Sequence, residues 1–126
     1  MVTSAARFIP NFGVKRGRFA VAVKYERTID GIVFDSKKEA SRYAELKLLQ
    51  RAGQIRELQL QPSWVVEING QRLCRFSADF SYLDPKLGRV IEDVKSRGGT
   101  SADPAYRLRK KAAELAYGIK IVEVIR

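Results

Sequence analysis

The stretch that decides the fold of this chain is LCRFSADFSYLDPKLGRVIEDVKS, residues 73–96. Apolar and polar side chains alternate along residues 73–83, which predicts a β-strand with one face in the core. Residues 84–88 contain a proline and a glycine and predict a turn. Residues 89–96 then predict the returning strand, so the whole stretch predicts a β-hairpin.

The hairpin carries two acids that its expected register brings face to face. If the loop closes symmetrically about Lys86, Asp79 lies opposite Asp93, at a Cβ separation of roughly 5 Å where like charges are destabilising. A hard divalent cation would remove this repulsion, and Mg²⁺ is commonly held by one or two carboxylates. Lys95 lies on the same face as Asp93. The alternative needs no metal, because acids on solvated strands are common and a shift of one residue would separate this pair.

A third acid lies in the segment SKKEASRYAELKLLQRA, residues 36–52, which predicts a helix. Glu39 falls in the first turn, on the same side as Tyr43 and Leu46, and this side is expected to face the protein. Two interpretations of Glu39 remain open. It follows Ser36 at the spacing of a capping box, in which its side chain would reach back to a backbone N–H. Alternatively, it is a third carboxylate directed at the metal pair.

The charge of the chain points to a polyanionic partner. The 126 residues carry a formal net charge of +10 and a pI near 10.0, which favours nucleic acid first and an acidic membrane surface second. Residues 1–24 hold basic residues but no acid, and they predict an arm that follows a phosphate backbone, or else a solubilising tail. Residues 25–126 suffice for a single domain with its own core. The candidate phosphate-binding residues are Lys15, Arg16, Arg18, Arg97, Arg107, Lys110 and Lys111.

The composition argues against several other classes of protein. The chain has no histidine, so catalysis by a histidine base and metal binding by imidazole are both absent. Its single cysteine, Cys74, can form neither an intrachain disulfide nor a paired-cysteine zinc site, and it fits a reducing compartment. No apolar run has transmembrane length, and residues 1–12 lack the apolar region of a signal peptide. We therefore expect a cytoplasmic protein that does not associate with membranes.

The segments around the hairpin predict an α/β fold. One strand is expected within residues 58–68, a second helix over residues 103–117 and a last strand over residues 119–125. A small separate hairpin is expected at residues 25–34, before the first helix. From the first helix onward the order is α-β-β-β-α-β, which gives a mixed central sheet flanked by helices.

The sequence predicts both ends of the second helix from residues that commonly cap helices. Asp103 would serve as N-cap and Pro104 as the first helical residue. Gly118 would end the helix in a left-handed conformation. The apolar stripe of this helix would consist of Leu108, Ala112, Leu115 and Ala116, with Arg107, Lys110 and Lys111 on the other side.

The ordered set of motifs resembles the PD-(D/E)XK nuclease superfamily. A helix acid, a strand aspartate and then Asp-x-Lys on the next strand follow one another as Glu39, Asp79 and Asp93-Val94-Lys95. More narrowly, the segments GIVFDSKKEASRYAELKLLQRAGQIRELQLQP, ADFSYLD, IEDVKS and YGIKIVEV resemble a family of small phage-encoded endonucleases. That family is described as a domain of unknown function and is related to Holliday-junction resolvases. The resemblance covers residues 25–126.

The resemblance implies a restriction-endonuclease-like core and a hydrolytic activity. It implies Mg²⁺- or Mn²⁺-dependent cleavage of DNA, selective for branched or junction DNA, by a homodimer in the cytoplasm of a bacterial host. Ala78 departs from the superfamily pattern, in which a proline commonly precedes the first aspartate. Two alternatives stay open: another nuclease of the same fold, of nicking, restriction-like or transposon-end type, and a nucleic-acid-binding module without activity.

The resemblance also implies a role for each motif residue. Asp79 and Asp93 correspond to the two strand acids, which hold the metal together with the Val94 carbonyl. Glu39 corresponds to the helix-borne acid, which binds the metal directly or through water. Lys95 corresponds to the motif lysine, which orients the attacking water or stabilises charge on the phosphate; a simple salt bridge to Asp93 is the alternative.

Overall fold

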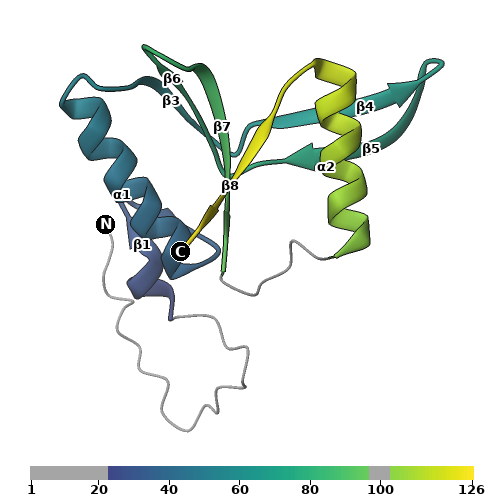
Figure 1. Ribbon diagram of the computed structural model, residues 1–126. Coiled ribbons are helices and arrows are strands. Elements are labelled where there is room, and N and C mark those ends of the chain that lie inside the picture. The colour runs from purple at the N-terminus through teal and green to yellow at the C-terminus, as the bar shows by residue number, and fades with distance from the viewer. Residues whose placement is uncertain (1–22, 97–102) are drawn as a thin grey trace, which may run out of the picture. The chain divides into compact units, whose positions relative to one another are not determined.

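The computed structural model describes residues 23–96 and 103–126 (Figure 1). These residues belong to two compact units, of which the first ends at Glu45 and the second begins at Leu46. Helix α1 (Lys37–Arg51) contains the boundary between them. The predicted basic arm lies almost entirely outside the described residues, and so do Lys15, Arg16, Arg18 and Arg97. The roles expected for these four residues therefore stay predictions.

In the first unit, a short 3₁₀-helix, η2 (Lys24–Arg27), precedes a hairpin of β1 (Thr28–Ile29) and β2 (Ile32–Val33). Asp30 and Gly31 join the two strands with φ angles of 55° and 76°. Positive φ at both central residues is typical of the type I′ turn, whose twist matches that of a two-residue hairpin. The Asp30-Gly31 hairpin is therefore confirmed.

Helix α1 begins at the predicted place, with Ser36 as its N-cap. The Ser36 hydroxyl accepts a hydrogen bond from the Glu39 N–H at 3.1 Å, and this satisfies a first-turn donor that has no partner within the helix. The Tyr43 hydroxyl donates to Asp30 Oδ2 at 2.9 Å and so connects the helix to the hairpin. Burial, together with this hydrogen bond, raises the pKa of Tyr43 to about 12, so the phenol stays neutral and remains a donor.

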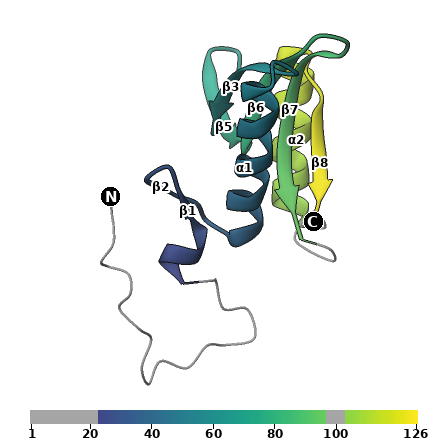
Figure 2. The same ribbon diagram turned by 90° about the vertical axis from the view of Figure 1, so that its left-hand side faces the viewer.

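The second unit is built on a mixed four-stranded sheet. In their order across the sheet, its strands are β3 (Arg56–Leu60), β6 (Phe80–Asp84), β7 (Gly88–Lys95) and β8 (Ile121–Ile125). Neighbouring strands are antiparallel except for β7 and β8, which run parallel. A parallel pair needs a crossover connection, and α2 (Pro104–Tyr117) supplies it. Figure 2 shows β7 and β8 side by side in front of α2.

A separate hairpin of β4 (Ser63–Ile68) and β5 (Gln71–Ser77) completes this unit. Its turn residues, Asn69 and Gly70, have φ angles of 51° and 77°, which again indicates a type I′ turn. Helix α2 packs against both strands of this hairpin. The described part of the chain is thus a mixed α/β structure with two α-helices and a mixed four-stranded sheet.

The strands differ from the sequence prediction in two respects. Residues 73–83 do not form one strand, because β5 ends at Ser77 and β6 begins at Phe80. Ala78 and Asp79 form the junction between the two sheets. In addition, the sequence does not predict β3, because its residues RELQL are mostly polar and exposed. That composition suits β3, since it pairs on one side only and edge strands commonly carry charged side chains.

The ends of α2 are confirmed as predicted. The Asp103 side chain accepts a hydrogen bond from the Ala105 N–H at 3.1 Å, and Pro104 is the first helical residue. Gly118 adopts the left-handed conformation with a φ of 64°, and its N–H donates to the Glu114 carbonyl. Neither helix in the described segments is long and apolar enough to cross a membrane.

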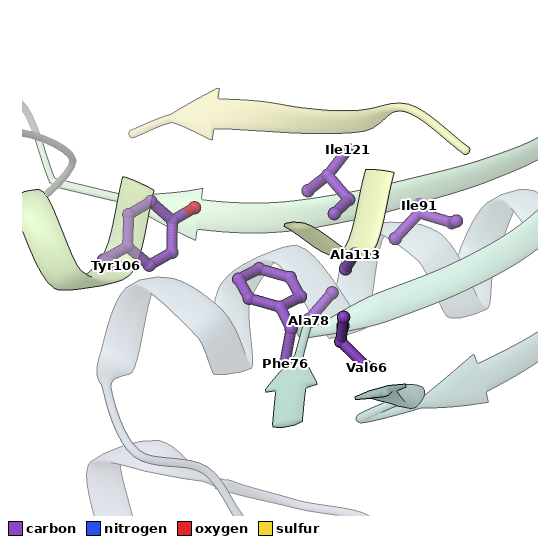
Figure 3. Packing of buried hydrophobic residues seen from close by; sticks show 7 residues of the cluster. All are labelled: Val66, Phe76, Ala78, Ile91, Tyr106, Ala113 and Ile121. Atoms are coloured by element: carbon purple, nitrogen blue, oxygen red, sulfur yellow. The ribbon is translucent and has the colours of Figure 1, made fainter. Parts of the chain in front are cut away.

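The buried face of α2 agrees with the predicted stripe only in part. Ala112 packs against the core cluster as predicted, but Leu108 and Leu115 are 71% and 73% exposed, whereas Tyr106 and Ala113 are buried. The prediction is wrong for the two leucines, because the helix instead packs one large ring and one small methyl group onto the sheet. The resulting core cluster consists of Val66, Phe76, Ala78, Ile91, Tyr106, Ala113 and Ile121 (Figure 3).

Candidate functional site

The register of the β6–β7 hairpin is the one expected from symmetric closure about Lys86. Phe80 pairs with Glu92 and Asp84 pairs with Gly88. The ladder ends at Phe80, however, so Asp79 is not a ladder partner of Asp93. The predicted register is confirmed within β6, and the direct pairing of the two aspartates is not observed.

Asp79 instead bonds to the backbone of β7 through both its main chain and its side chain. Its N–H donates to the Glu92 carbonyl at 3.0 Å, and its Oδ2 accepts the Val94 N–H at 2.7 Å. The Asp79 carbonyl accepts the Gln61 N–H at 2.9 Å. A continued ladder would offer Val94 a backbone carbonyl, but the chain bends away toward β5 at this point. The Asp79 carboxylate takes that place, which puts it beside the backbone of the Asp93-Val94-Lys95 motif.

Asp93 and Lys95 share one face of β7, because side chains two residues apart point the same way. Asp93 is only 5% exposed. The Lys95 Nζ lies 3.1 Å from Asp93 Oδ2, and the Tyr106 hydroxyl of α2 donates to the same oxygen at 2.7 Å. The Lys95 ammonium also lies 3.7 Å from the centroid of the Tyr106 ring, within the range of a cation–π interaction. Asp93, Lys95 and Tyr106 therefore form one closely packed group.

A fourth member of this group, Glu123, is missed by sequence reasoning. The parallel register places Glu123 of β8 beside Asp93 of β7. Its Oε2 lies 3.2 Å from the Tyr106 hydroxyl and 3.4 Å from the Lys110 Nζ. One signal could have found it, because Glu123 is the only polar residue in the strand IVEVI. The group thus contains two acids, two lysines and one tyrosine.

The tyrosine at the centre of this group is neutral. Burial and then the hydrogen bond to Asp93 raise the pKa of Tyr106 far above its ordinary value, and the charge of Glu123 adds to the effect. A neutral phenol has one hydrogen to donate, and the nearer acceptor is Asp93. In Figure 3 the Tyr106 hydroxyl, drawn in red, lies beside β7, the strand that carries Asp93.

Glu92 lies on the opposite face of β7 from Asp93. It is 2% exposed, and its Oε2 accepts a hydrogen bond from the Tyr82 hydroxyl of β6 at 2.5 Å. Glu92 shares its face with Val90 and Val94, because side chains two residues apart on a strand point the same way.

The other predicted site residues lie in different surroundings. Glu39 is buried and belongs to the first unit, whereas Asp79, Asp93 and Lys95 belong to the second. Within residues 23–96 and 103–126, no group of three or more acids or cysteines could hold a metal ion. Arg107 and Lys111 are exposed on α2, as phosphate contacts require, whereas Lys110 is half-buried beside Glu123.

The chain matches the model of a known protein family. Residues 21–125 match the model of a family described as "Protein of unknown function (DUF1064)". The chain belongs to the DUF1064 family. No curated protein and no solved structure matches this chain. The family match covers Asp79, Asp93, Lys95, Tyr106 and Glu123.

The oxygen atoms at this DUF1064 site suit a hard cation. Carboxylate and carbonyl oxygens are the ligands that Mg²⁺ and Mn²⁺ prefer, and one or two carboxylates often suffice when water and phosphate complete the shell. Both protein contacts of Asp93 go to Oδ2, so within the described residues Oδ1 has no protein partner. The side chains of Asp79 and Asp93 and the Val94 carbonyl would be the residues that hold such an ion.

Proposed function

We propose that this protein is a metal-dependent DNA endonuclease with a PD-(D/E)XK core. The observation that carries the proposal is the arrangement of Asp93 and Lys95 on one face of β7, 3.1 Å apart, beside the junction where the Asp79 carboxylate meets the Val94 N–H. A buried acid and a lysine on one strand, next to a second acid at a strand bend, are suited to bind a cation and to handle a phosphate. The order of Glu39, Asp79 and Asp93-Val94-Lys95 along the chain supports the same superfamily.

Each residue has a definite part in this reaction. Asp79 and Asp93 would hold the cation, with the Val94 carbonyl as a further oxygen and Glu39 as the third acid. When bound, Mg²⁺ or Mn²⁺ polarises the scissile phosphate and lowers the pKa of its bound water. Lys95 orients or helps deprotonate the attacking water, or stabilises the negative charge that develops on the phosphate.

The proposed substrate is DNA, and branched or junction DNA in particular. The net charge of +10 favours a polyanion, and the exposed Arg107 and Lys111 on α2 are available for backbone phosphates. Resolution of a four-way junction requires two symmetric cuts, which a two-fold homodimer would supply. Such an enzyme would work in the cytoplasm, on intracellular DNA.

A second candidate is a nucleic-acid-binding protein without cleavage activity. Two observations favour it: Asp93 is already held by Lys95 and Tyr106, and the described residues contain no group of three acids that could hold a metal ion. Another nuclease of the same fold, of nicking, restriction-like or transposon-end type, differs from the first proposal only in its substrate.

A single gel assay separates these candidates. Labelled four-way junction, flap, single-stranded and linear duplex DNA would each be incubated with the full chain and Mg²⁺, Mn²⁺ or EDTA. The proposal expects metal-dependent cutting of the junction in preference to the linear duplex. Salt-sensitive binding of DNA without cutting would select the binding protein, and equal cutting of all duplexes would select another nuclease. Glu67→Gln, a change at an exposed acid on β4, serves as the control for loss of one negative charge.

A further inference from the structure

The group around Asp93 contains more residues than the proposed reaction uses. Tyr106, Lys110 and Glu123 come from α2 and β8, and no motif assigns them a role. The Tyr106 hydroxyl lies 2.7 Å from Asp93 Oδ2 and 3.2 Å from Glu123 Oε2, so it links the two acids. Their position raises the question of what they do for Asp93.

The contacts of Asp93 are unevenly distributed over its two oxygens. Tyr106 and Lys95 both approach Oδ2, so within the described residues Oδ1 is the oxygen without a protein partner. A carboxylate held at one oxygen by two donors cannot rotate freely, and its other oxygen has a defined direction. Ligating carboxylates are commonly oriented by outer hydrogen bonds of this kind, and loss of such a partner weakens metal binding.

Tyr106 is itself held in place from two sides. Its ring packs in the core cluster, 5.8 Å from the centroid of Phe76. Its hydroxyl lies next to Glu123, which also pairs with Lys110 at 3.4 Å. The ring fixes the position of the hydroxyl, and Glu123, which is paired with Lys110, lies within 3.2 Å of it.

We propose that Tyr106 is a positioning residue that aims Asp93 Oδ1 at a divalent cation, and that Glu123 and Lys110 hold the Tyr106 hydroxyl in place for this task. The inference rests on the proposed function, because it supposes that Asp93 binds a metal ion. It adds a support built from α2 and β8, two elements that lie outside the Asp79 and Asp93-Val94-Lys95 motifs.

Tyr106→Phe is the decisive variant, because it removes the hydroxyl but keeps the ring that packs against Phe76 and lies under Lys95. Tyr117→Phe is the matched control. Tyr117 lies on the same helix, and its hydroxyl donates to the Val65 carbonyl of β4 at 2.6 Å, far along the helix from Asp93. Both variants lose one hydroxyl and one hydrogen bond from α2.

The readout is direct binding of Mn²⁺ to the full-length protein, followed by the electron paramagnetic resonance signal of free Mn²⁺. Tyr106→Phe is expected to weaken Mn²⁺ binding by about 10- to 100-fold, the usual effect of losing an outer-shell partner, and Tyr117→Phe by less than about twofold, since it touches no ligand. Thermal unfolding of both variants shows whether either change acts through stability alone.

The outcomes distinguish this inference from the proposed function. If wild type binds Mn²⁺ and Tyr106→Phe binds it equally well, the positioning role is overturned while the endonuclease proposal stands. If Tyr106→Phe loses Mn²⁺ affinity but wild type cuts none of the DNA substrates, the positioning role stands and the endonuclease proposal does not. Wild type that binds no Mn²⁺ overturns both.

Discussion

The two faces of β7 carry neighbouring buried acids, Glu92 and Asp93, and each accepts a hydrogen bond from a tyrosine. On one face the tyrosine is Tyr82 of the adjacent strand, at 2.5 Å. On the other it is Tyr106 of the crossover helix, at 2.7 Å. Glu92 and Asp93 are thus both buried and both accept a hydrogen bond from a tyrosine, but Asp93 also pairs with Lys95 of its own strand.

The difference between the faces lies in where the donors come from. Tyr82 and Glu92 sit on hairpin strands close in sequence, so their contact serves the packing of one hairpin. Asp93 meets residues from α2 and β8 as well, and it lies next to the Val94 N–H that the Asp79 carboxylate accepts. Convergence of charged groups from several elements is typical of a functional site.

The largest expected effect comes from replacing Asp93 and Glu92 in two separate variants. Asp93→Asn should lower the rate of DNA cleavage by at least about 100-fold, the scale on which loss of one charge-stabilising group acts, while DNA binding is kept or strengthened. Glu92→Gln should retain most of the cleavage. Single-turnover rates in Mg²⁺ and gel-shift binding in EDTA measure the two effects. Near wild-type cleavage by Asp93→Asn would reject the assignment of the site to this face.

Two substitutions at Asp79 distinguish a structural role of its side chain from a role in DNA cleavage. Asp79→Asn retains an oxygen that can accept the Val94 N–H, so its melting temperature should stay close to that of wild type while cleavage is lost. Asp79→Ala leaves that N–H without its acceptor and should in addition lower the free energy of unfolding by about 1–3 kcal/mol. Urea unfolding of both variants, beside cleavage rates, checks this. Full activity in Asp79→Asn would leave Asp79 with a structural role only.

Substitution of Glu39 tests whether an acid from the first unit also contributes to DNA cleavage. The observed Ser36 contact uses the Glu39 N–H, so it survives any change of the side chain. If Glu39 is only a capping residue, Glu39→Gln should leave cleavage intact, because glutamine also serves at that position. If it binds the metal, cleavage should fall by orders of magnitude with little change in melting temperature, and we expect this second result.

The smallest expected effect concerns the Glu92 face. Tyr82→Phe removes the hydrogen bond to Glu92 and should lower the free energy of unfolding by about 1–3 kcal/mol, because a buried acceptor loses a donor. The Tyr82→Phe variant should bind Mn²⁺ as tightly as wild type. A loss of Mn²⁺ affinity as large as that expected for Tyr106→Phe would mean that the two faces do not differ in function.

Features that depend on a few adjacent residues follow from the sequence alone. The Asp30-Gly31 turn, the Ser36 and Asp103 caps, the left-handed Gly118 and the register of the β6–β7 hairpin are all of this kind. In each case a short loop or a capping side chain sets the geometry, whatever the rest of the chain does. The same local rules place Asp93 and Lys95 on one face and Glu92 on the other.

Only the tertiary structure decides which of these residues meet. The chain passes from β5 into a different sheet through Ala78 and Asp79 before β6 begins, so the Asp79 side chain, and not its backbone, meets Val94. Alternation alone cannot signal such a bend. Helix α2 buries Tyr106 in place of its leucines, and the Tyr106 ring packs in one core cluster with residues of the sheet and of the β4–β5 hairpin.

Glu123 shows the same limit most clearly. Its place beside Asp93 depends on the parallel register of β7 and β8, and these strands are joined by a helical crossover with no short turn to set that register. The sequence therefore determined the turns, the caps and the face of each hairpin residue. The packing of α2 and β8 against β7 determined that Tyr106 contacts Asp93 and that Glu123, paired with Lys110, lies beside them, because contacts between distant segments depend on the whole core.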